Sequence, residues 1–365
     1  MVDPSQVRNE DLQLALCGRA ERAEQARLFD ACFKKGATPE DLAWRYDLGP
    51  HGQAVSILAR PPGGEGISGY ACSPRRALCY GDESTLAPVG ETGDVMTHPD
   101  WRKRGIFSSL DRRCMEEVGQ LGWPLVFGLP NRRSAHIFLE LGWERIGTVR
   151  PYSFPLRADA AARAEAFREG RLRAWLLPLH VARSGRLLRR SERPDLTTRR
   201  LERFPPETLD LSRALEKRFA FMVRRDPDYL NWRFVENPAR LHDVLGVYRG
   251  EELVALVTVQ RPRAGSCVGF LVDVLAPGED ALSAAVGIGL RHLGAAGASV
   301  VQSTAIDRSW WADKLKGSGF LPPKESNHLI VILHPHDRDH PLVKAAREAS
   351  SWFFTDGDRD DATMG

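Results

Sequence analysis

The sequence lacks closely spaced cysteine pairs, long hydrophobic runs and a large net charge. Its six cysteines are scattered without a Cys-x-x-Cys motif, so in a chain of 365 residues we expect reduced thiols and neither a disulfide framework nor a metal site. No stretch approaches the roughly 18 unbroken apolar residues of a membrane span, and residues 1–30 lack a basic start followed by an apolar run. These absences argue against a secreted or membrane-bound protein, and we expect a cytoplasmic one.

The small net charge argues against a nucleic-acid partner. Lysine and arginine number 51 against 48 acidic residues, a formal net charge of +3, whereas nucleic-acid-binding proteins usually concentrate a much stronger basic excess on one face. Hydrophobic residues make up 42% and charged residues 27%, which is ordinary for a globular protein, and the length exceeds what one core usually serves. We therefore predict two domains, in a chain that is a monomer or a homodimer.

An internal repeat supports the two-domain prediction. The segments "TPEDLAWRYDLGP" (38–50) and "DPDYLNWRFVENP" (226–238) match at six positions, each pair 188 residues apart. The matched pairs are Pro39/Pro227, Leu42/Leu230, Trp44/Trp232, Arg45/Arg233, Tyr46/Phe234 and Pro50/Pro238. Each segment precedes a hairpin-like run with a Gly-containing turn, and each half closes with an amphipathic helix, a glycine and an aromatic residue. We infer two tandem copies of one α+β fold, each a mixed β-sheet flanked by helices.

Composition divides the chain into four segments. We expect a first domain over 1–155, a basic helical linker over 156–200, a second domain over 201–334 and a tail over 335–365. A solvated linker helix is preferred over one that lies on a membrane, because basic residues fall on several of its faces. Within the tail, "WFFTDGDRDD" (352–361) joins three aromatics to four aspartates. A flexible acidic end is the preferred interpretation, and an anchored tail that faces a cationic amine is the alternative.

The stretch "HPDWRKRGIFSSL" (98–110) indicates an anion site. It places basic residues and a glycine immediately ahead of an apolar helical pattern. The first N–H groups of a helix lack internal partners, and the helix dipole adds roughly half a positive charge there, so a phosphate is a natural occupant. Gly105 would let a diphosphate approach the main chain, while Arg102 and Arg104 would supply charge-assisted hydrogen bonds. A basic turn that caps an acidic neighbour is the alternative reading.

Two blocks together resemble the acyl-CoA-dependent N-acetyltransferases of the GNAT superfamily. They are "VMTHPDWRKRGIFSSL" and "GLPNRRSAHIFLELGWERIG", and the resemblance covers about residues 30–155. It implies that the phosphate belongs to coenzyme A, that acetyl-CoA is the co-substrate, and that a splayed strand aims backbone N–H groups at the thioester carbonyl. The cofactor-binding residues implied are Met96, Thr97, Arg102, Lys103, Arg104, Gly105, Ile106, Phe107, Asn131 and Ser134. The chain departs from the family at Phe107, where Gly or Ala is usual, and at Phe138, where many relatives carry Tyr.

Acyl transfer to an amine requires a group that accepts the amine's proton. Glu91 lies six residues before Thr97, a spacing at which histone-type relatives place a catalytic glutamate, so Glu91 is the first candidate for the general base. In a regular strand, residues 91, 93, 95 and 97 share one face, and Asp94, the second candidate, lies on the opposite face. Because Phe138 cannot donate a proton, Tyr152 is the candidate general acid. Alternatively, the carboxylates solvate a strand end and Tyr152 is a core residue.

At the start of the corresponding helix, the second copy carries acidic residues where the first carries basic residues. In "FLVDVLAPGEDALSAAVGIGLRHLG" (270–294), Glu279 and Asp280 begin the helix and would repel a diphosphate, so this copy is expected to keep the fold without the cofactor. It would instead shape a substrate cleft. Trp44, Arg45 and Trp232 are the candidates for that cleft, and packing around a buried ion pair is the alternative role.

These observations favour an N-acetyltransferase that acts on a primary amine of a small molecule, such as an amino sugar or a natural-product intermediate. Two other hypotheses stay open. The chain could be an aminoacyl transferase of the kind that pairs two GNAT-like domains and uses charged tRNA, against which the diphosphate loop argues. It could also be a ligand-binding module without catalysis, against which Glu91 argues more weakly.

Overall fold

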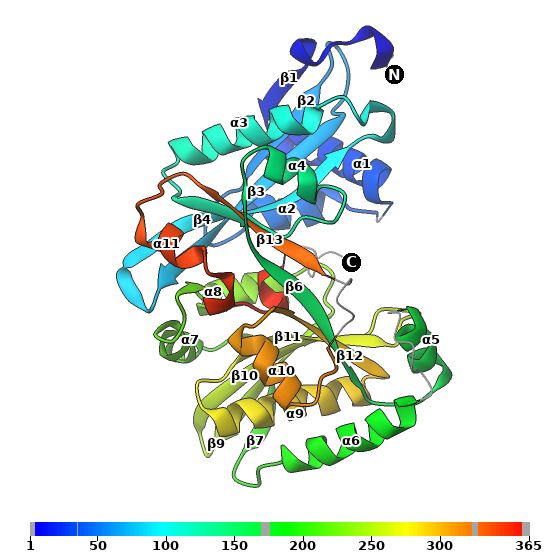
Figure 1. Cartoon of the computed structure of the whole chain (residues 1–365), viewed down its shortest axis with the longest axis vertical. Helices are drawn as coiled ribbons and strands as arrows, with labels where there is room; N and C mark the ends of the chain where they lie inside the picture. The colour runs from blue at the N-terminus through cyan, green and yellow to red at the C-terminus, as the bar shows by residue number, and fades with distance from the viewer. Residues whose placement is uncertain (1–3, 35, 169–175, 323–327, 360–365) are drawn as a thin grey trace.

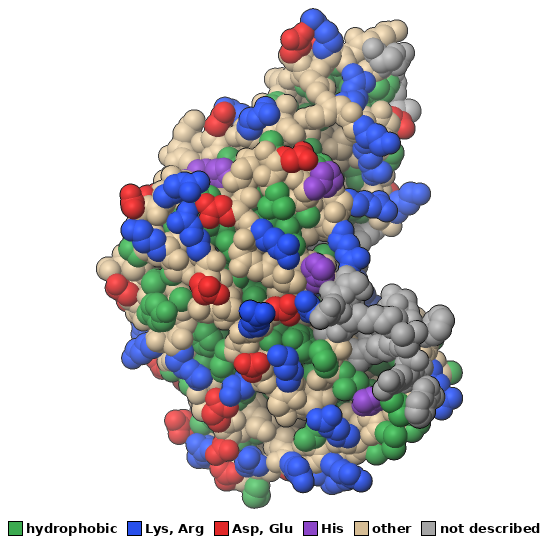
Figure 2. Space-filling view, in the orientation of Figure 1, with side chains coloured by type: hydrophobic (Ala, Val, Ile, Leu, Met, Phe, Trp, Pro, Cys, Tyr) green, Lys and Arg blue, Asp and Glu red, His purple; other side chains and the backbone are tan. Residues whose placement is uncertain are grey.

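The structure, a computed structural model, describes residues 4–34, 36–168, 176–322 and 328–359 (Figure 1). Two halves follow one another along the long axis of the molecule, and each consists of a sheet with helices packed on its faces (Figure 1). Basic and acidic side chains are interspersed over the face drawn in Figure 2. None of the described helices is both long and apolar enough to cross a membrane.

The first half contains the helices and strands that the sequence patterns predict. Its strands are β1 (Gln13–Leu16), β2 (Val55–Arg60), β3 (Ser68–Cys79), β4 (Asp82–Thr97), β5 (Leu125–Gly128) and β6 (Glu144–Pro155). Its helices are α1 (Arg22–Phe33), α2 (Pro39–Asp47), α3 (Ile106–Gln120) and α4 (Ala135–Glu140). Thr38 begins α2 as a capping box, since its hydroxyl accepts from the Asp41 N–H while the Asp41 carboxylate accepts from the Thr38 N–H.

Two helices, α5 (Ala160–Arg168) and α6 (Leu177–Arg190), follow β6 where a helical linker is predicted. The strands of the second half are β7 (Thr197–Leu201), β8 (Phe221–Val223), β9 (His242–Arg249), β10 (Glu252–Gln260), β11 (Val268–Leu275), β12 (Val300–Ile306), β13 (Leu329–Pro335) and β14 (Trp352–Phe353). Its helices are α7 (Thr208–Glu216), α8 (Pro227–Leu230) with the π-turn Asn231–Val235, α9 (Glu279–Ala295), α10 (Trp310–Gly317), α11 (Pro341–Ala346) and the 3-10 turn η8 (Asp356–Asp358).

The strands of both halves join in one mixed sheet. Its order is β1-β2-β3-β4-β5-β13-β6-β12-β11-β10-β9-β7, with β8 on β3 and β14 on β8. Most neighbours are antiparallel, but β4 pairs β5 and β11 pairs β12 in parallel. The α+β architecture and the mixed sheet flanked by helices are therefore confirmed, with the parallel pair at the same place in each half.

The two halves share strands at the centre of the sheet. The first part of β6 pairs with β13, from Glu144 to Val149, and the second part pairs with β12, from Val149 to Pro155. Strand β13 in turn lies between β5 and β6, although it begins at Leu329, far along the chain from the end of β5 at Gly128 and the end of β6 at Pro155. In Figure 1 the orange β13 crosses beside the green β6, which extends from one half into the other. The domain boundaries at 155, 200 and 334 stay a prediction. Strands β12 and β13 pair with strands of the first half across these boundaries.

The repeated tryptophans form the centre of the contact between the halves. The rings of Trp44 and Trp232 stack with centroids 5.0 Å apart. Each indole donates to the other residue's backbone carbonyl, Trp44 to Trp232 at 3.1 Å and Trp232 to Trp44 at 3.0 Å. This reciprocal pairing of equivalent residues is what an internal two-fold relation between duplicated halves produces. Both side chains are buried in the largest hydrophobic cluster, so the packing alternative is correct and they are not cleft residues.

The C-terminal segment is packed against the rest of the molecule. Trp352, Phe353 and Phe354 lie in the same central cluster as the tryptophan pair, and β14 adds to β8 in parallel. The expectation of a flexible acidic end is therefore wrong for residues 352–358, and the anchored tail is the correct alternative. Asp360 and Asp361 lie outside the described residues.

Candidate active site

A cleft opens where β4 and β5 separate. The two strands pair only over residues 90–92 and 126–128, and β4 then continues to Thr97 after β5 has ended at Gly128. The cavity in this gap measures about 230 Å³, and α1, α2, β4, the end of β5, α4, β13 and Arg359 contribute its walls. Splayed strands expose a backbone edge that has no described strand partner on that side, which is the feature that the resemblance implies.

A β-bulge at Asp94 changes the predicted alternation of β4. Opposite β3, Gly93 pairs with Ala71 and Met96 pairs with Gly69, so two residues of β4 face one of β3. Asp94 adopts φ 46°, a left-handed conformation that is uncommon outside glycine. The bulge places Met96, not Thr97, on the face of Glu91, and it directs Asp94 toward α2. The expectation that Asp94 lies opposite Glu91 is therefore wrong, because the strand is not regular.

Both carboxylates line the cleft, and each is held by an arginine. An Arg75 guanidinium nitrogen lies 2.5 Å from Glu91 Oε2, and that guanidinium packs over the rings of Tyr229 and Trp232. Arg45 Nε lies 3.2 Å from Asp94 Oδ2, which also accepts from the Tyr46 hydroxyl. Arg45 is thus the one cleft candidate of its group that does line the cavity. A carboxylate in the cleft can accept a proton directly or through water, so both are candidates for the general base.

The turn before α3 has the backbone geometry of an anion cradle. Gly105 adopts φ 76° at the N-cap of α3, and Lys103 adopts φ 64° just before it. A left-handed N-cap without a side chain brings the first amides of the helix close to a ligand. Arg102 donates from Nε to the Thr97 carbonyl at 3.1 Å, and it lies beside Cys32, where burial raises the pKa of the thiol against the lowering effect of this guanidinium. Arg102 is therefore placed between the strand end and the turn.

Arg104 has a different environment from the one expected. Its guanidinium donates to the carbonyls of Pro4 and Val7 and lies over the ring of Trp101, 5.3 Å from the centroid. Asn9 in turn donates to the Arg104 carbonyl. Arg104 thus fastens the N-terminal segment to the turn, and we no longer assign its side chain to the phosphates. The sequence could not show this, because the partners lie about 100 residues away.

The remaining cofactor candidates fall into structural and cleft-lining groups. Asn131 Oδ1 accepts from the N–H groups of Arg133 and Ser134 at 2.9 and 3.1 Å, which starts α4, and both Asn131 and Ser134 line the cleft. The side chain of Ile106, the first residue of α3, is buried. Met96 is also buried, and its backbone carbonyl accepts a hydrogen bond from the Ser68 hydroxyl. The Thr97 hydroxyl also contacts Ser68, at 2.8 Å.

Aromatic packing accounts for the two departures from the family pattern. The rings of Phe107 and Phe138 meet edge to face with centroids 5.0 Å apart, and Phe138 also packs on Trp143. Phe107 therefore fills space between α3 and α4 instead of leaving the loop open on that side.

Tyr152 does not reach the cleft. It lies on the part of β6 that pairs with β12 and is buried in the hydrophobic cluster of the second half. Burial, reinforced by Asp307, raises the pKa of its hydroxyl. The core interpretation of Tyr152 is therefore correct. The sequence missed Phe33, Leu329 and Arg359, which line the cleft from α1, β13 and the tail. Only the tertiary structure brings these distant segments together.

In the second half, the chain itself fills the equivalent gap. Strands β11 and β12 pair only over residues 268–270 and 300–302 and then diverge, and η8 lies between them. Asp356 Oδ2 accepts from the Thr304 N–H of β12 at 2.5 Å, and the Thr355 hydroxyl donates to Asp273 of β11 at 2.9 Å. The tail thus bonds to both strands of the gap.

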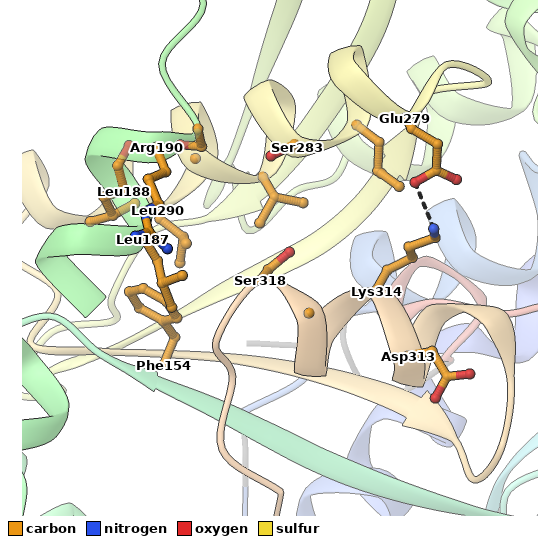
Figure 3. A pocket seen from close by; sticks show the side chains of 15 residues that line it. Phe154, Leu187, Leu188, Arg190, Glu279, Ser283, Leu290, Asp313, Lys314 and Ser318 are labelled. Atoms are coloured by element: carbon orange, nitrogen blue, oxygen red, sulfur yellow. Dashed lines mark hydrogen bonds and ion pairs between the residues drawn. The ribbon is translucent and has the colours of Figure 1, made fainter. Parts of the chain in front are cut away.

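Helix α6 covers the groove between α9 and α10. Gly287 and Gly319 leave the space that Ser191 and Leu187 occupy, since a Cβ at either glycine would clash with them. A cavity of about 400 Å³ remains beside this contact (Figure 3). At its rim Glu279 Oε2 accepts from Lys314 Nζ at 2.6 Å, so the acid at the start of α9 already has a cation. In the part of the chain that the structure describes, no group of three His, Cys, Asp or Glu side chains could hold a metal ion.

Comparison with known proteins finds a family model that covers most of the first half. Residues 17–146 match the family model of the acetyltransferase (GNAT) domain, and a search of curated proteins finds no significant match. A solved structure from Enterococcus faecalis, described as a probable N-acyltransferase, aligns with a TM-score of 0.61 and 14% identity over 89% of this chain and 72% of that one. A GCN5-related N-acetyltransferase from Anabaena variabilis gives a TM-score of 0.60 and 12% identity over 89% and 73%.

A tandem GNAT protein from the clavulanic acid biosynthesis pathway, solved without acetyl-CoA, aligns over 89% of this chain and 98% of its own, with a TM-score of 0.57 and 11% identity. At such identities these structures establish the fold alone. The matched segment contains β4, β5 and α4, which line the cleft, and α3, whose start carries the glycine cap, whereas Leu329 and Arg359 of the cleft lie outside it. Residues 17–146 thus match a GNAT acetyltransferase domain, and the chain as a whole shares the fold of the tandem GNAT protein.

Proposed function

We propose that this protein transfers an acetyl group from acetyl-CoA to a primary amine of a small molecule, by direct attack with general-base assistance. The observation that carries the proposal is the gap between β4 and β5, which opens beside the glycine-capped start of α3 within the segment that matches the GNAT domain. Acetyl-CoA would supply an activated acetyl thioester. A strand gap next to a helix N-terminus fits a ligand with an extended arm and a diphosphate.

The residues proposed to hold acetyl-CoA follow from their positions. The amides from Lys103 to Phe107 and the guanidinium of Arg102 would contact the diphosphate, with Gly105 allowing the close approach. Asn131 and Ser134 would contact the arm from the α4 side of the cleft. Backbone N–H groups near Met96 and Thr97, at the splayed end of β4, would stabilise negative charge on the thioester oxygen.

For proton transfer we propose Glu91 as the base, with Asp94 as the second candidate. Both line the cleft on the face toward α2, where an amine that enters between the halves would arrive. The Arg75 guanidinium fixes the position of the Glu91 carboxylate, which would take a proton from the acceptor's ammonium group, directly or through a water molecule, and so leave the neutral amine that attacks the thioester. Phe138 cannot reprotonate the departing thiolate, and the described residues that line the cleft include no tyrosine, cysteine or histidine in its place.

A small acceptor suits the walls of the cleft. The second half, β13 and the tail close one side of a cavity of only about 230 Å³, which fits an amino sugar or a natural-product intermediate better than a protein side chain on a large surface. One similar fold is described as belonging to the clavulanic acid biosynthesis pathway, which agrees with a natural-product role by analogy only.

Isothermal titration and thermal melting with acetyl-CoA test the proposal, followed by thiol release with a panel of amines. At 100 times its dissociation constant the ligand should stabilise the fold by about 2.7 kcal/mol. Absence of heat and of any thermal shift at millimolar acetyl-CoA would refute the proposal and favour an aminoacyl transferase. Binding without turnover of any amine would favour a non-catalytic module.

A further inference from the structure

We propose that Arg359 recognises an anionic group on the acceptor, so that the preferred substrate is an amine that also carries a carboxylate or phosphate. This inference rests on the proposed acetyltransferase function and names its substrate class. Arg359 comes from the C-terminal tail yet lines the cleft of the first half, with its side chain about 20% exposed. Neither the family match, which ends at residue 146, nor the sequence pattern points to it.

The tail that carries Arg359 is anchored in the second half. Asp356 and Thr355 bond to β12 and β11, and the Asp358 carboxylate lies 2.6 Å from a guanidinium nitrogen of Arg225. Arg225 is buried and also contacts Asp273 at 3.2 Å. The Arg233 guanidinium donates to the Arg359 carbonyl at 2.7 Å. The gap that binds a cofactor in the first half thus binds the tail in the second, which gives the second copy a role after loss of cofactor binding.

The Arg359 guanidinium has a fixed orientation. Its Nη1 donates to the Thr304 hydroxyl at 2.8 Å and to Asp356 Oδ1 at 3.1 Å. Asp356 and Thr304 are themselves joined through the Thr304 N–H, so two linked groups of the second half hold one cation at the wall of the first. A guanidinium fixed before binding loses little entropy when it binds an anion.

The charges around the cleft fit a zwitterion. Glu91 and Asp94 lie on β4 with their arginine partners, while Arg359 comes from the tail with its partner Asp356 and lines the same cavity. Each side therefore pairs charges of both signs, and the cleft has no excess of negative charge that would attract a simple polyamine. An acceptor with its ammonium toward the carboxylates and its anion toward Arg359 would complement both.

Matched amine pairs test this inference in the full-length protein. We would compare 4-aminobutyrate with butylamine, lysine with cadaverine and glucosamine 6-phosphate with glucosamine, following thiol release from acetyl-CoA. The anionic member should have a kcat/KM at least ~10-fold higher, since a charge-assisted hydrogen bond contributes about 1.5–3 kcal/mol. Equal or better turnover of the members without an anionic group would overturn the inference while leaving the acetyltransferase proposal intact. Binding of acetyl-CoA without turnover of any anionic member would overturn it too.

Two variants place the preference on Arg359. R359Q should remove the preference by raising KM for the anionic amine, with the acetyl-CoA dissociation constant unchanged. T304V, which removes one hydrogen bond to the guanidinium and keeps the side-chain shape, should reduce the preference partly and serves where R359Q folds poorly. R338Q is the matched control, because Arg338 is exposed and pairs with Glu144 outside the cleft. A preference that survives unchanged in both R359Q and T304V would refute the assignment.

Discussion

At the residue scale, Glu91 and Asp94 are the two candidates for the general base. If Glu91 is the base, Glu91→Gln should lower turnover by about 10² to 10⁴ at neutral pH while acetyl-CoA affinity is retained. Titration calorimetry and thiol release measure the two quantities separately. Because the substitution also removes the charge that pairs with Arg75 at this contact, folding is checked by thermal melting first.

Asp94→Asn and Glu251→Gln complete this comparison. Glu251 is exposed in the second half and pairs with Arg199, so its variant should be fully active. Full activity of Glu91→Gln with loss in Asp94→Asn would transfer the role to Asp94, whose bulge position the sequence did not predict.

A second residue-scale prediction concerns His242. Burial, with Arg233 and Arg263 nearby, lowers the pKa of this imidazole to about 4, and neither ring nitrogen has a hydrogen-bond partner among the described residues. Because the unfolded-state pKa is higher, near 6.5, the unfolded chain binds the proton more readily. The contribution of neutral His242 to the free energy of unfolding is therefore fully present above about pH 6.5, and it is lost as the pH falls toward 4.

His242→Phe should remove this part of the pH dependence, since the ring already packs on Phe234 at 5.2 Å. Between about pH 7 and pH 5, the Tm of the variant should fall by at least ~2 °C less than that of the parent. His136→Phe, on the exposed side of α4, is the control. An identical fall in Tm for His242→Phe and the parent would contradict the assignment.

At the scale of elements, the starts of α3 and α9 occupy equivalent places in the two halves, and we predict that only the start of α3 binds the cofactor. Gly105→Glu should abolish acetyl-CoA binding, because it puts a carboxylate against the diphosphate at a position with φ 76°. Gly105→Ala separates the effects, since it strains the turn without adding charge. Gly278→Glu is the matched control at the N-cap of α9, where φ is −88° and nothing lies within 4 Å of an added Cβ.

Calorimetry with acetyl-CoA gives the readout for this set. Gly278→Glu and Glu279→Ala should bind acetyl-CoA as the parent does. Equal losses at both helix starts would disprove the difference between the two halves.

At the scale of the whole molecule, the shared strands make the first half dependent on the second. A fragment of residues 1–155 lacks β13, which lies between β5 and β6, and it lacks Trp232, the partner of Trp44. We predict that this fragment does not fold cooperatively, as judged by circular dichroism during heating. Co-expression with residues 156–365 should restore a folded complex, and a sharp melt of the isolated fragment with acetyl-CoA binding would refute the prediction.

The sequence by itself determined what depends on local pattern and on the repeat. It predicted the hairpins of β2 with β3 and of β9 with β10, the helix that starts at Gly105, and the duplication. These follow from turn chemistry, hydrophobic periodicity and a constant 188-residue offset, all of which are local or self-comparing signals.

Only the tertiary structure decided which of these residues meet. It assigned Trp44 and Trp232 to packing, Tyr152 to a core and Arg104 to the N-terminal segment, and it brought Arg359 into the cleft. The bulge at Asp94 and the insertion of β13 between β5 and β6 likewise depend on pairings between distant strands. A sequence records which residues alternate or recur along the chain. The place of β13 between β5 and β6, and the tail bound between β11 and β12, depend on contacts between segments far apart in the sequence. Such contacts leave no periodic pattern from which they could be predicted.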